Sequence, residues 1–154
     1  MRSRKAKKHP INPDPIFKSR LVTRVVNKVM LHGKKSVAET IVYNAIMGLA
    51  EDPKQAIVIF EDAVKNAMPK QEVRSRRVGG TTYQVPYPTK HDRSESLAIR
   101  WIVEAARGRK GEKMEHKLLK ELKDAYEGVG NAIRKRDDTH KMAESNKAFA
   151  HFRF

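Results

Sequence analysis

The chain has 154 residues, enough for one domain with a sizeable core, and its 33 Lys and Arg against 18 Asp and Glu give a formal net charge of +15. Such a charge favours a phosphate-rich partner and binding that weakens as salt rises. The absence of cysteine excludes disulfides and thiolate metal sites. No apolar run reaches the roughly 18 residues of a membrane-spanning helix, and no apolar signal segment follows the basic N-terminus. We therefore expect a soluble, cytoplasmic protein with no membrane partner.

Residues 1–12 are predicted to form a flexible basic arm. Met1–His9 contains no acidic residue, and Pro10, Pro13 and Pro15 then disfavour regular structure. A disordered tail that only aids solubility is the alternative, but nothing within the arm neutralises its cations, so contact with nucleic acid is favoured. The candidate contacts in the arm are Arg2, Arg4, Lys5, Lys7 and Lys8.

Residues 19–68 have the period of amphipathic helices and are predicted to form three of them. Gly33 is expected to end the first helix in a left-handed conformation. Asp52-Pro53 should end the second helix and begin the third, which Pro69 then terminates. The positions expected to face the core are Leu21, Val22, Val25, Val26, Val29, Met30, Val37, Ile41, Ala45, Ile46, Leu49, Ile57, Phe60, Val64 and Met68.

Residues 72–88 are predicted to form a two-stranded β-ribbon. Val, Thr, Tyr and Arg fill two extended runs, and Gly79-Gly80 between them accepts the positive φ of a tight turn. Arg74, Arg76 and Arg77 lie on one strand, and a solitary hairpin is marginal in water, so we expect the ribbon to become ordered against a polyanion. An edge hairpin with a solvated basic face is the alternative interpretation.

Residues 92–148 are predicted to form three further helices, with a basic loop between Gly108 and Gly111. The last of these helices, over residues 133–147, is polar almost all round, which indicates a helix that a partner completes. It leads into an aromatic and basic tail over residues 149–154. The expected core positions in this half are Leu97, Ala98, Trp101, Ile102, Ala105, Met114, Leu118, Leu122, Ala125 and Tyr126.

Polar residues indicate where three of the helices begin. Ser36 and Glu39 have the spacing of a capping box for the second helix. Asp92 and Glu95 form a similar pair before the fourth helix, and Asn131 is a suitable N-cap for the last.

The sequence contains no pattern typical of an enzyme. The run Gly33-Lys34-Lys35-Ser36 resembles the end of a phosphate-binding loop, but Lys28 occupies the position of the required first glycine and a helix precedes it. The six histidines are scattered without metal-ligand spacing. We therefore expect no catalytic activity, no cofactor and no metal ion.

The basic residues fall into clusters dispersed along the chain, whereas a sequence-specific DNA-binding protein usually concentrates its contacts on one recognition helix. A dispersed surface favours a folded RNA that is recognised by shape and backbone. A DNA-binding architectural or regulatory protein is the alternative. Beyond the arm, the candidate contacts are Lys34, Lys35, Arg74, Arg76, Arg77, Arg93, Arg107, Arg109, Lys110, Lys113 and Lys117.

Several long motifs resemble one known family over essentially the whole chain, that of the seventh protein of the small ribosomal subunit. The motifs are Asp14-Pro15, Gly33-Lys34-Lys35-Ser36-Val37-Ala38, Ile41-Val42-Tyr43, Arg76-Arg77-Val78-Gly79-Gly80, Tyr83-Gln84-Val85-Pro86, Ala98-Ile99-Arg100-Trp101, Lys135–Glu144 and Asn146–Arg153. The resemblance implies a mainly α fold: a single domain over residues 1–154 with a six-helix body over residues 19–68 and 92–148, and the ribbon between the third and fourth helices. After Pro86 this chain departs from its relatives, which leaves open an early end of the second strand.

The resemblance also implies a function without catalysis. The family binds the 3′ major domain of small-subunit rRNA, nucleates assembly of the head of the subunit, and lies near the eleventh small-subunit protein. Its ribbon and last helix approach the exit-site tRNA and the mRNA path. Carried over to this chain, the residues near tRNA and mRNA are Gly79, Gly80, Thr81, Tyr83, Lys135, Arg136 and Lys141.

Overall fold

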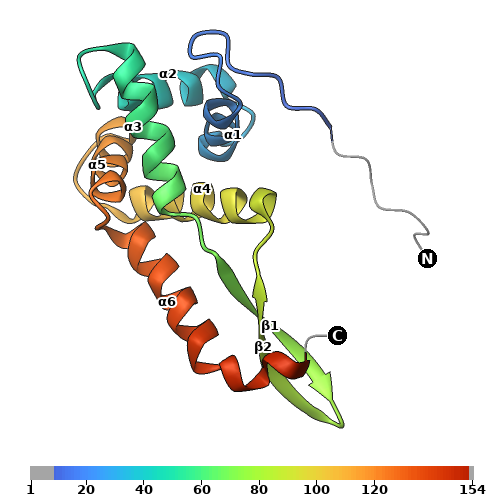
Figure 1. The fold of residues 1–154 in the computed structure, drawn as a ribbon. Helices are drawn as coiled ribbons and strands as arrows, with labels where there is room; N and C mark the ends of the chain where they lie inside the picture. Colours follow the sequence, from blue (N-terminus) through green and yellow to red (C-terminus); the bar gives the residue numbers. More distant parts are fainter. Residues whose placement is uncertain (1–8, 153–154) are drawn as a thin grey trace.

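The computed structural model describes residues 9–152, which form a helical body with a protruding β-ribbon (Figure 1). The predicted class, mainly α with a hairpin between the third and fourth helices, is confirmed. The arm cations Arg2, Arg4, Lys5, Lys7 and Lys8 lie outside the described residues. In chain order the elements are α1 (Arg20–Val29), α2 (Lys35–Met47), α3 (Pro53–Asn66), β1 (Gln71–Val78), β2 (Thr81–Pro88), α4 (His91–Gly108), α5 (Met114–Tyr126), α6 (Asn131–Ser145) and the 3-10 helix η1 (Lys147–Phe152).

The hydrophobic core lies among α1 to α5 and extends to the start of α6. Phe60, Ile46, Ile102, Leu118 and Leu122 are among its largest fully buried side chains, and each comes from the apolar stripe predicted for its helix. Two predicted core residues are wrong: Val37 is 54% exposed and Tyr126 is 47% exposed. No helix within residues 9–152 combines the length and the apolar character needed to cross a membrane.

The helix boundaries confirm the predicted start of α3 but shift three predicted helix ends, since α2 already ends at Met47, before Asp52-Pro53. Asp52 caps α3 by accepting a hydrogen bond from the Lys54 N–H at 3.0 Å, with Pro53 in the first turn. Gly33 has the expected positive φ of 73°, but α1 already ends at Val29, so Gly33 belongs to the turn that follows. The third helix ends at Asn66, before Pro69.

The three other capping predictions are wrong. Helix α2 begins at Lys35, so Ser36 is already helical and makes no capping bond. Helix α4 begins at His91 without a side-chain cap, and Glu95 is buried instead of capping. Helix α6 begins at Asn131 itself, preceded by Gly130.

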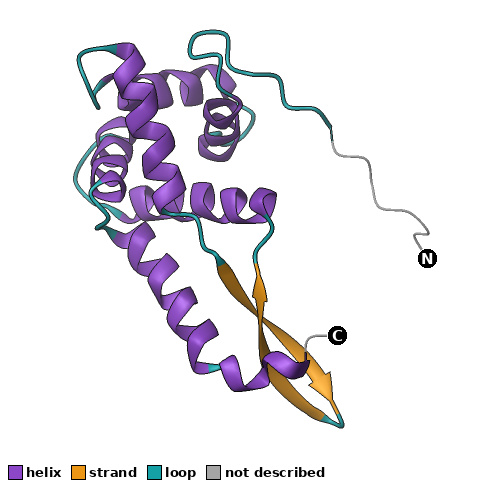
Figure 2. Ribbon diagram, in the orientation of Figure 1, coloured by secondary structure: helices purple, strands orange, loops and turns teal. Residues whose placement is uncertain are grey.

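The ribbon is a regular antiparallel hairpin that runs from the pair Gln71 and Pro88 to the pair Val78 and Thr81 (Figure 2). Gly79 and Gly80 form its turn with φ of 57° and 87°, as predicted. The second strand does not end early, because it stays paired through Pro88. In a hairpin with a two-residue turn, the residues on either side of the turn form a hydrogen-bonded pair, here Val78 and Thr81, and non-hydrogen-bonded and hydrogen-bonded pairs then alternate along the strands. Pro86 and Pro88 both fall in non-hydrogen-bonded pairs, so the missing proline N–H costs the ribbon no hydrogen bond between its strands.

Helix α6 leaves the body and runs beside the ribbon, and η1 then lies against the ribbon itself (Figure 1). The ribbon is therefore supported along its length by the C-terminal part of the chain. This support was not apparent from the sequence, where the ribbon was expected to become ordered only on binding.

The connector before α1 is fixed to the body by the buried carboxylate of Asp14. This group accepts hydrogen bonds from the backbone N–H groups of Ile16 and Phe17 and from the Tyr43 hydroxyl at 2.6 Å. Burial of the Tyr43 hydroxyl, together with its hydrogen bond to Asp14, raises the pKa of Tyr43. The contact determines where the N-terminal arm leaves the helical body.

Candidate nucleic-acid interface

The three ribbon arginines have different surroundings. Arg74 pairs with Glu72 and lies over the ring of Tyr87, 5.5 Å from its centroid. Arg76 donates from Nη1 to the carbonyl oxygen of Phe152 at 2.9 Å. Arg77 is exposed and has no partner within residues 9–152, so it is the ribbon arginine best placed for a phosphate.

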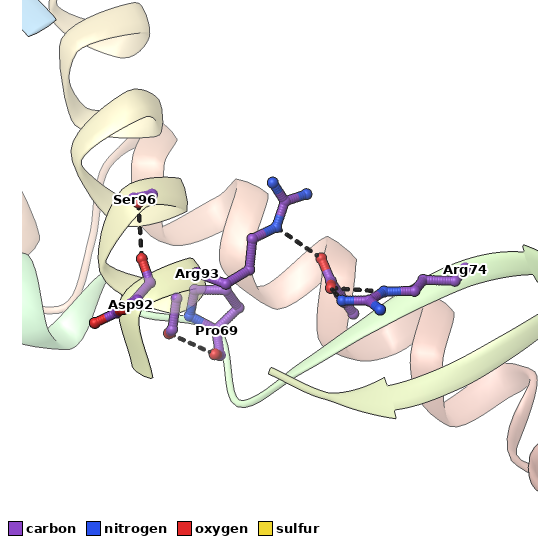
Figure 3. A network of polar contacts seen from close by, with 7 residues as sticks. Pro69, Arg74, Asp92, Arg93 and Ser96 are labelled. Carbon is purple, nitrogen blue, oxygen red and sulfur yellow. Dashed lines mark hydrogen bonds and ion pairs between the residues drawn. The ribbon is translucent and has the colours of Figure 1, made fainter. Parts of the chain in front are cut away.

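Glu72 links the base of the ribbon to α4. Its buried carboxylate accepts from Arg74 and, at 3.3 Å, from Arg93, and Figure 3 shows these two arginines turned toward the same point from β1 and α4. Burial raises the pKa of the Glu72 carboxyl, but hydrogen bonds and charges from the two arginines outweigh burial and hold the pKa below its usual value. Arg74 and Arg93 therefore fix the ribbon against the body while half of each side chain stays exposed.

The outer half of the ribbon carries an aromatic cluster shared with η1. The ring of Tyr83 lies 5.2 Å from that of Phe149 and 4.8 Å from that of Phe152. Tyr83 was predicted to lie near tRNA or mRNA, together with Gly79, Gly80 and Thr81. The turn residues and Thr81 are exposed, whereas the ring of Tyr83 is half-buried against the C-terminal helix.

The predicted cations from Arg107 to Lys117, at the end of α4, in the loop after it and at the start of α5, differ in whether they have a partner within the chain. Arg109 is held by the fully buried carboxylate of Glu121 at 2.6 Å and by Asp124, and these hydrogen bonds raise its pKa despite partial burial. Arg107 donates to the carbonyl oxygen of Val29 at 3.2 Å. Within the described residues, Lys110 and Lys113 in the loop are exposed and have no partner, and Lys117, in the first turn of α5, is partly exposed and also has none.

The cations of α6 also differ in whether they have a partner within the chain. Arg136 donates to the carbonyl oxygen of Asn66 at 2.6 Å and pairs with Asp137, whereas Lys135 reaches Glu104 at 3.3 Å. Lys141 is exposed, with no partner for its ammonium group in the part of the chain the structure describes.

His140 on α6 accepts a hydrogen bond at its Nε2 atom from the backbone N–H of Lys70, at 2.9 Å. Burial and the nearby positive charge of Arg136 lower its pKa, which keeps the ring neutral and able to accept this bond.

Lys34 and Lys35 lie at the start of α2. Lys35 forms an ion pair with Glu39 at 3.5 Å, one turn along the helix. Lys34 is exposed and has no partner within residues 9–152.

Sequence reasoning missed a further group of cations between α1 and α4. Arg24 pairs at 2.5 Å with Glu95, a carboxylate that is only 5% exposed, and also donates to the hydroxyl of Ser96. Arg20 lies 3.8 Å from the same carboxylate. The available signal was the four-residue spacing of Arg20 and Arg24 beside the apolar stripe of α1.

Within residues 9–152, no three His, Asp or Glu side chains are grouped so that they could hold a metal ion. The exposed cations are distributed over α2, the ribbon, the loop after α4, and α6.

The model of the family described as Ribosomal protein S7p/S5e matches residues 1–147. The chain belongs to this family. The curated relatives named "Small ribosomal subunit protein uS7" include that of Fervidobacterium nodosum, 52% identical over the whole of both chains. That of Thermotoga maritima is 51% identical, also over the whole of both chains. That of Carboxydothermus hydrogenoformans is 54% identical over 96% of this chain and 95% of the relative.

Membership confirms the family resemblance drawn from the motifs. The relatives of the S7p/S5e family are ribosomal proteins and not enzymes, in agreement with the non-catalytic interpretation of the sequence.

Proposed function

We propose that this S7p/S5e family member is a constituent of the small ribosomal subunit that binds the 3′ major domain of its rRNA and nucleates assembly of the head. The observation that supports this most directly is the exposed Arg77 on a ribbon whose base and outer half are both held in place. A held cation loses little conformational entropy when it meets a phosphate, and each counterion released adds to the affinity.

The exposed cations on other elements extend this surface. Lys34 at the start of α2, Lys110 and Lys113 after α4, and Lys141 on α6 have side chains available to several segments of a folded RNA. Arg107, Arg109 and Arg136 are engaged by the chain itself, because their guanidinium groups bind carboxylates or carbonyl oxygens of other residues.

The tip of the ribbon and the exposed face of α6 are proposed to lie near the exit-site tRNA and the mRNA path. Gly79, Gly80 and Thr81 lie at the outer end of the ribbon, and Lys141 is one of the exposed cations on the neighbouring helix. The eleventh small-subunit protein is the proposed neighbour of the C-terminal region. We also propose that residues 1–12 are a basic arm that contacts the rRNA and that residues 1–154 form a single domain.

Filter binding tests this function against the DNA-binding alternative. The full chain is titrated with a head-domain rRNA fragment and with a duplex DNA of equal phosphate content, over a range of salt concentrations. We expect tight, salt-sensitive binding to the RNA and much weaker binding to the duplex. Equal affinity at moderate salt would contradict the proposal and favour the DNA-binding alternative.

A further inference from the structure

A short linker over residues 67–70 joins α3 to β1 at the base of the ribbon. Its last residue, Lys70, is bonded through both backbone groups. The N–H of Lys70 donates to Nε2 of His140 on α6 at 2.9 Å, and its carbonyl oxygen accepts the N–H of Thr89, just after β2, at 3.0 Å. The two ends of the ribbon therefore meet at a residue that His140 joins to α6, the helix that runs beside the ribbon (Figure 1).

Two further bonds hold the end of α3 and the linker through groups that do not titrate in mild acid. Arg136, one turn before His140 on α6, donates to the carbonyl oxygen of Asn66 at 2.6 Å. The carbonyl oxygen of Pro69 accepts from the hydroxyl of Ser94 on α4 at 2.7 Å (Figure 3). A guanidinium group and a hydroxyl keep their donors when a histidine becomes charged. The bond at His140 can therefore respond to pH while these two persist.

The ring of His140 can accept its hydrogen bond in one protonation state. A neutral imidazole has one N–H and one acceptor nitrogen, so an accepting Nε2 places the proton on Nδ1. A protonated ring has two N–H groups and no acceptor, and its Nε2–H would then face the N–H of Lys70. Protonation therefore replaces a hydrogen bond with two opposed donors.

The half-buried ring of His140 lines a cavity of about 420 Å³ between the base of the ribbon, α6 and η1, so solvent protons can reach it. The charged residues that act on the ring or share this cavity are Lys70 before β1, Arg136, Asp137 and Glu144 on α6, and Lys147 in η1. Burial and the positive charges of Arg136 and Lys70 lower the pKa of His140, whereas the charge of Asp137 raises it. The net direction is downward, so the bond is intact at neutral pH and acid is needed to break it.

We propose that His140 is a pH-sensitive joint between α6 and the base of the ribbon, closed while the ring is neutral and opened when the ring is protonated. Opening is local, because Arg136 still holds the end of α3 and the aromatic contacts of Tyr83 still hold the outer half of the ribbon. The inference goes beyond the proposed function and does not depend on rRNA, so it is tested on the free chain.

Amide hydrogen exchange of the Lys70 N–H tests the joint, measured by NMR on the full chain between about pH 8 and about pH 5. Because the intrinsic exchange rate itself varies with pH, the protection factor is the quantity compared. In the wild type we expect this factor to fall by roughly tenfold across the range, the scale of one lost hydrogen bond. The midpoint of the fall should coincide with that of the His140 ring signals. Constant protection, or a midpoint that differs from that of the ring, would overturn the proposal.

The variant His140→Gln separates the charge of the ring from its position. The side-chain carbonyl oxygen of Gln lies as many bonds from the backbone as Nε2 of His, and it accepts a hydrogen bond without titrating. We therefore expect the Lys70 N–H to stay protected in His140→Gln across the whole pH range. His140→Leu removes the acceptor, so the same N–H should lose its protection at both ends of the range.

His116→Gln on α5 is the matched control, because the side chain of His116 is more than half exposed and α5 lies away from the ribbon (Figure 1). It should show the pH dependence of the wild type. If the pH dependence of Lys70 protection persists unchanged in His140→Gln, another group is responsible and the proposal is wrong. Should His140→Leu fail to fold, the comparison of the wild type with His140→Gln still decides the question.

Discussion

The ring of Tyr83 on β2 lies 4.8 Å, centroid to centroid, from the ring of Phe152 in η1. Because Arg76 on β1 also donates to the carbonyl oxygen of Phe152, both strands of the ribbon contact the C-terminal helix. The C-terminal end of the chain thus returns to the ribbon and restrains its outer half with aromatic contacts.

We expect Phe152→Ala to loosen the outer half of the ribbon while leaving the helical body intact. An aromatic pair contributes about 0.5 to 1.5 kcal/mol beyond its buried area, so the loss is local. Amide hydrogen exchange should then show faster exchange over residues 76–83 and unchanged protection in α4 and α5. Tyr126→Ala is the control, because the exposed Tyr126 has no aromatic partner in residues 9–152; equal protection in the two variants would contradict the aromatic restraint.

Arg109→Ala should act mainly on stability, in contrast to the neighbouring Lys110→Ala. Removing Arg109 leaves the fully buried Glu121 without its cation, which costs about 3 kcal/mol or more. For a chain of this size the melting temperature should fall by about 6 to 12 °C. Lys110→Ala should melt like the wild type and weaken rRNA binding. Calorimetry and filter binding on both variants check this, and equal melting temperatures would show that the Glu121 pair stabilises little.

The pH dependence of stability should carry a contribution from Glu72. Its pKa is lower in the folded than in the unfolded chain, so its contribution is present above the unfolded pKa and is lost as pH falls through the folded pKa. Urea denaturation at a series of acidic pH values should therefore show a smaller loss of stability for Glu72→Gln than for the wild type. Glu51→Gln, at an exposed position, should follow the wild-type curve throughout.

The helical body follows closely from the sequence because it depends on local periodicity. The apolar stripe from Val22 to Val29 is buried. Asp52 and Pro53 begin α3, because the Asp52 side chain caps the helix and Pro53 fits its first turn. The ribbon turn is equally local, since Gly79-Gly80 alone determines it. These features were predictable because neighbouring residues decide them.

The partners of the charged side chains were not predictable from the sequence. Glu95 resembles a capping residue, yet it binds Arg24, 71 positions earlier. Arg109 resembles a loop cation available to RNA, yet Glu121 and Asp124 hold it. Such pairs depend on the packing of α1 against α4 and of the loop against α5, which no local pattern specifies.

Among the ribbon arginines, Arg77→Ala should weaken rRNA binding with the smallest effect on folding. Arg77 has no partner within residues 9–152, whereas Arg76 bonds Phe152 and Arg74 bonds Glu72. We expect Arg77→Ala to lower the salt slope by about 0.7 to 0.9 with an unchanged melting temperature. The triple change Arg74→Ala/Arg76→Ala/Arg77→Ala should lower affinity further and also loosen the ribbon. An unchanged salt slope in Arg77→Ala would exclude a phosphate contact at this position.

Gly80→Val should distort the turn for a conformational reason alone. A Cβ at Gly80 would meet no atom within 4 Å, but φ is 87°, a region that β-branched residues strongly disfavour. We expect loss of the cross-strand NMR contacts between Val78 and Thr81, while the helical signals persist. Thr81→Val is the control, because it places the same β-branched side chain in an extended strand residue next to the turn. Native hairpin signals in Gly80→Val would contradict the assignment of a turn that requires positive φ at this position.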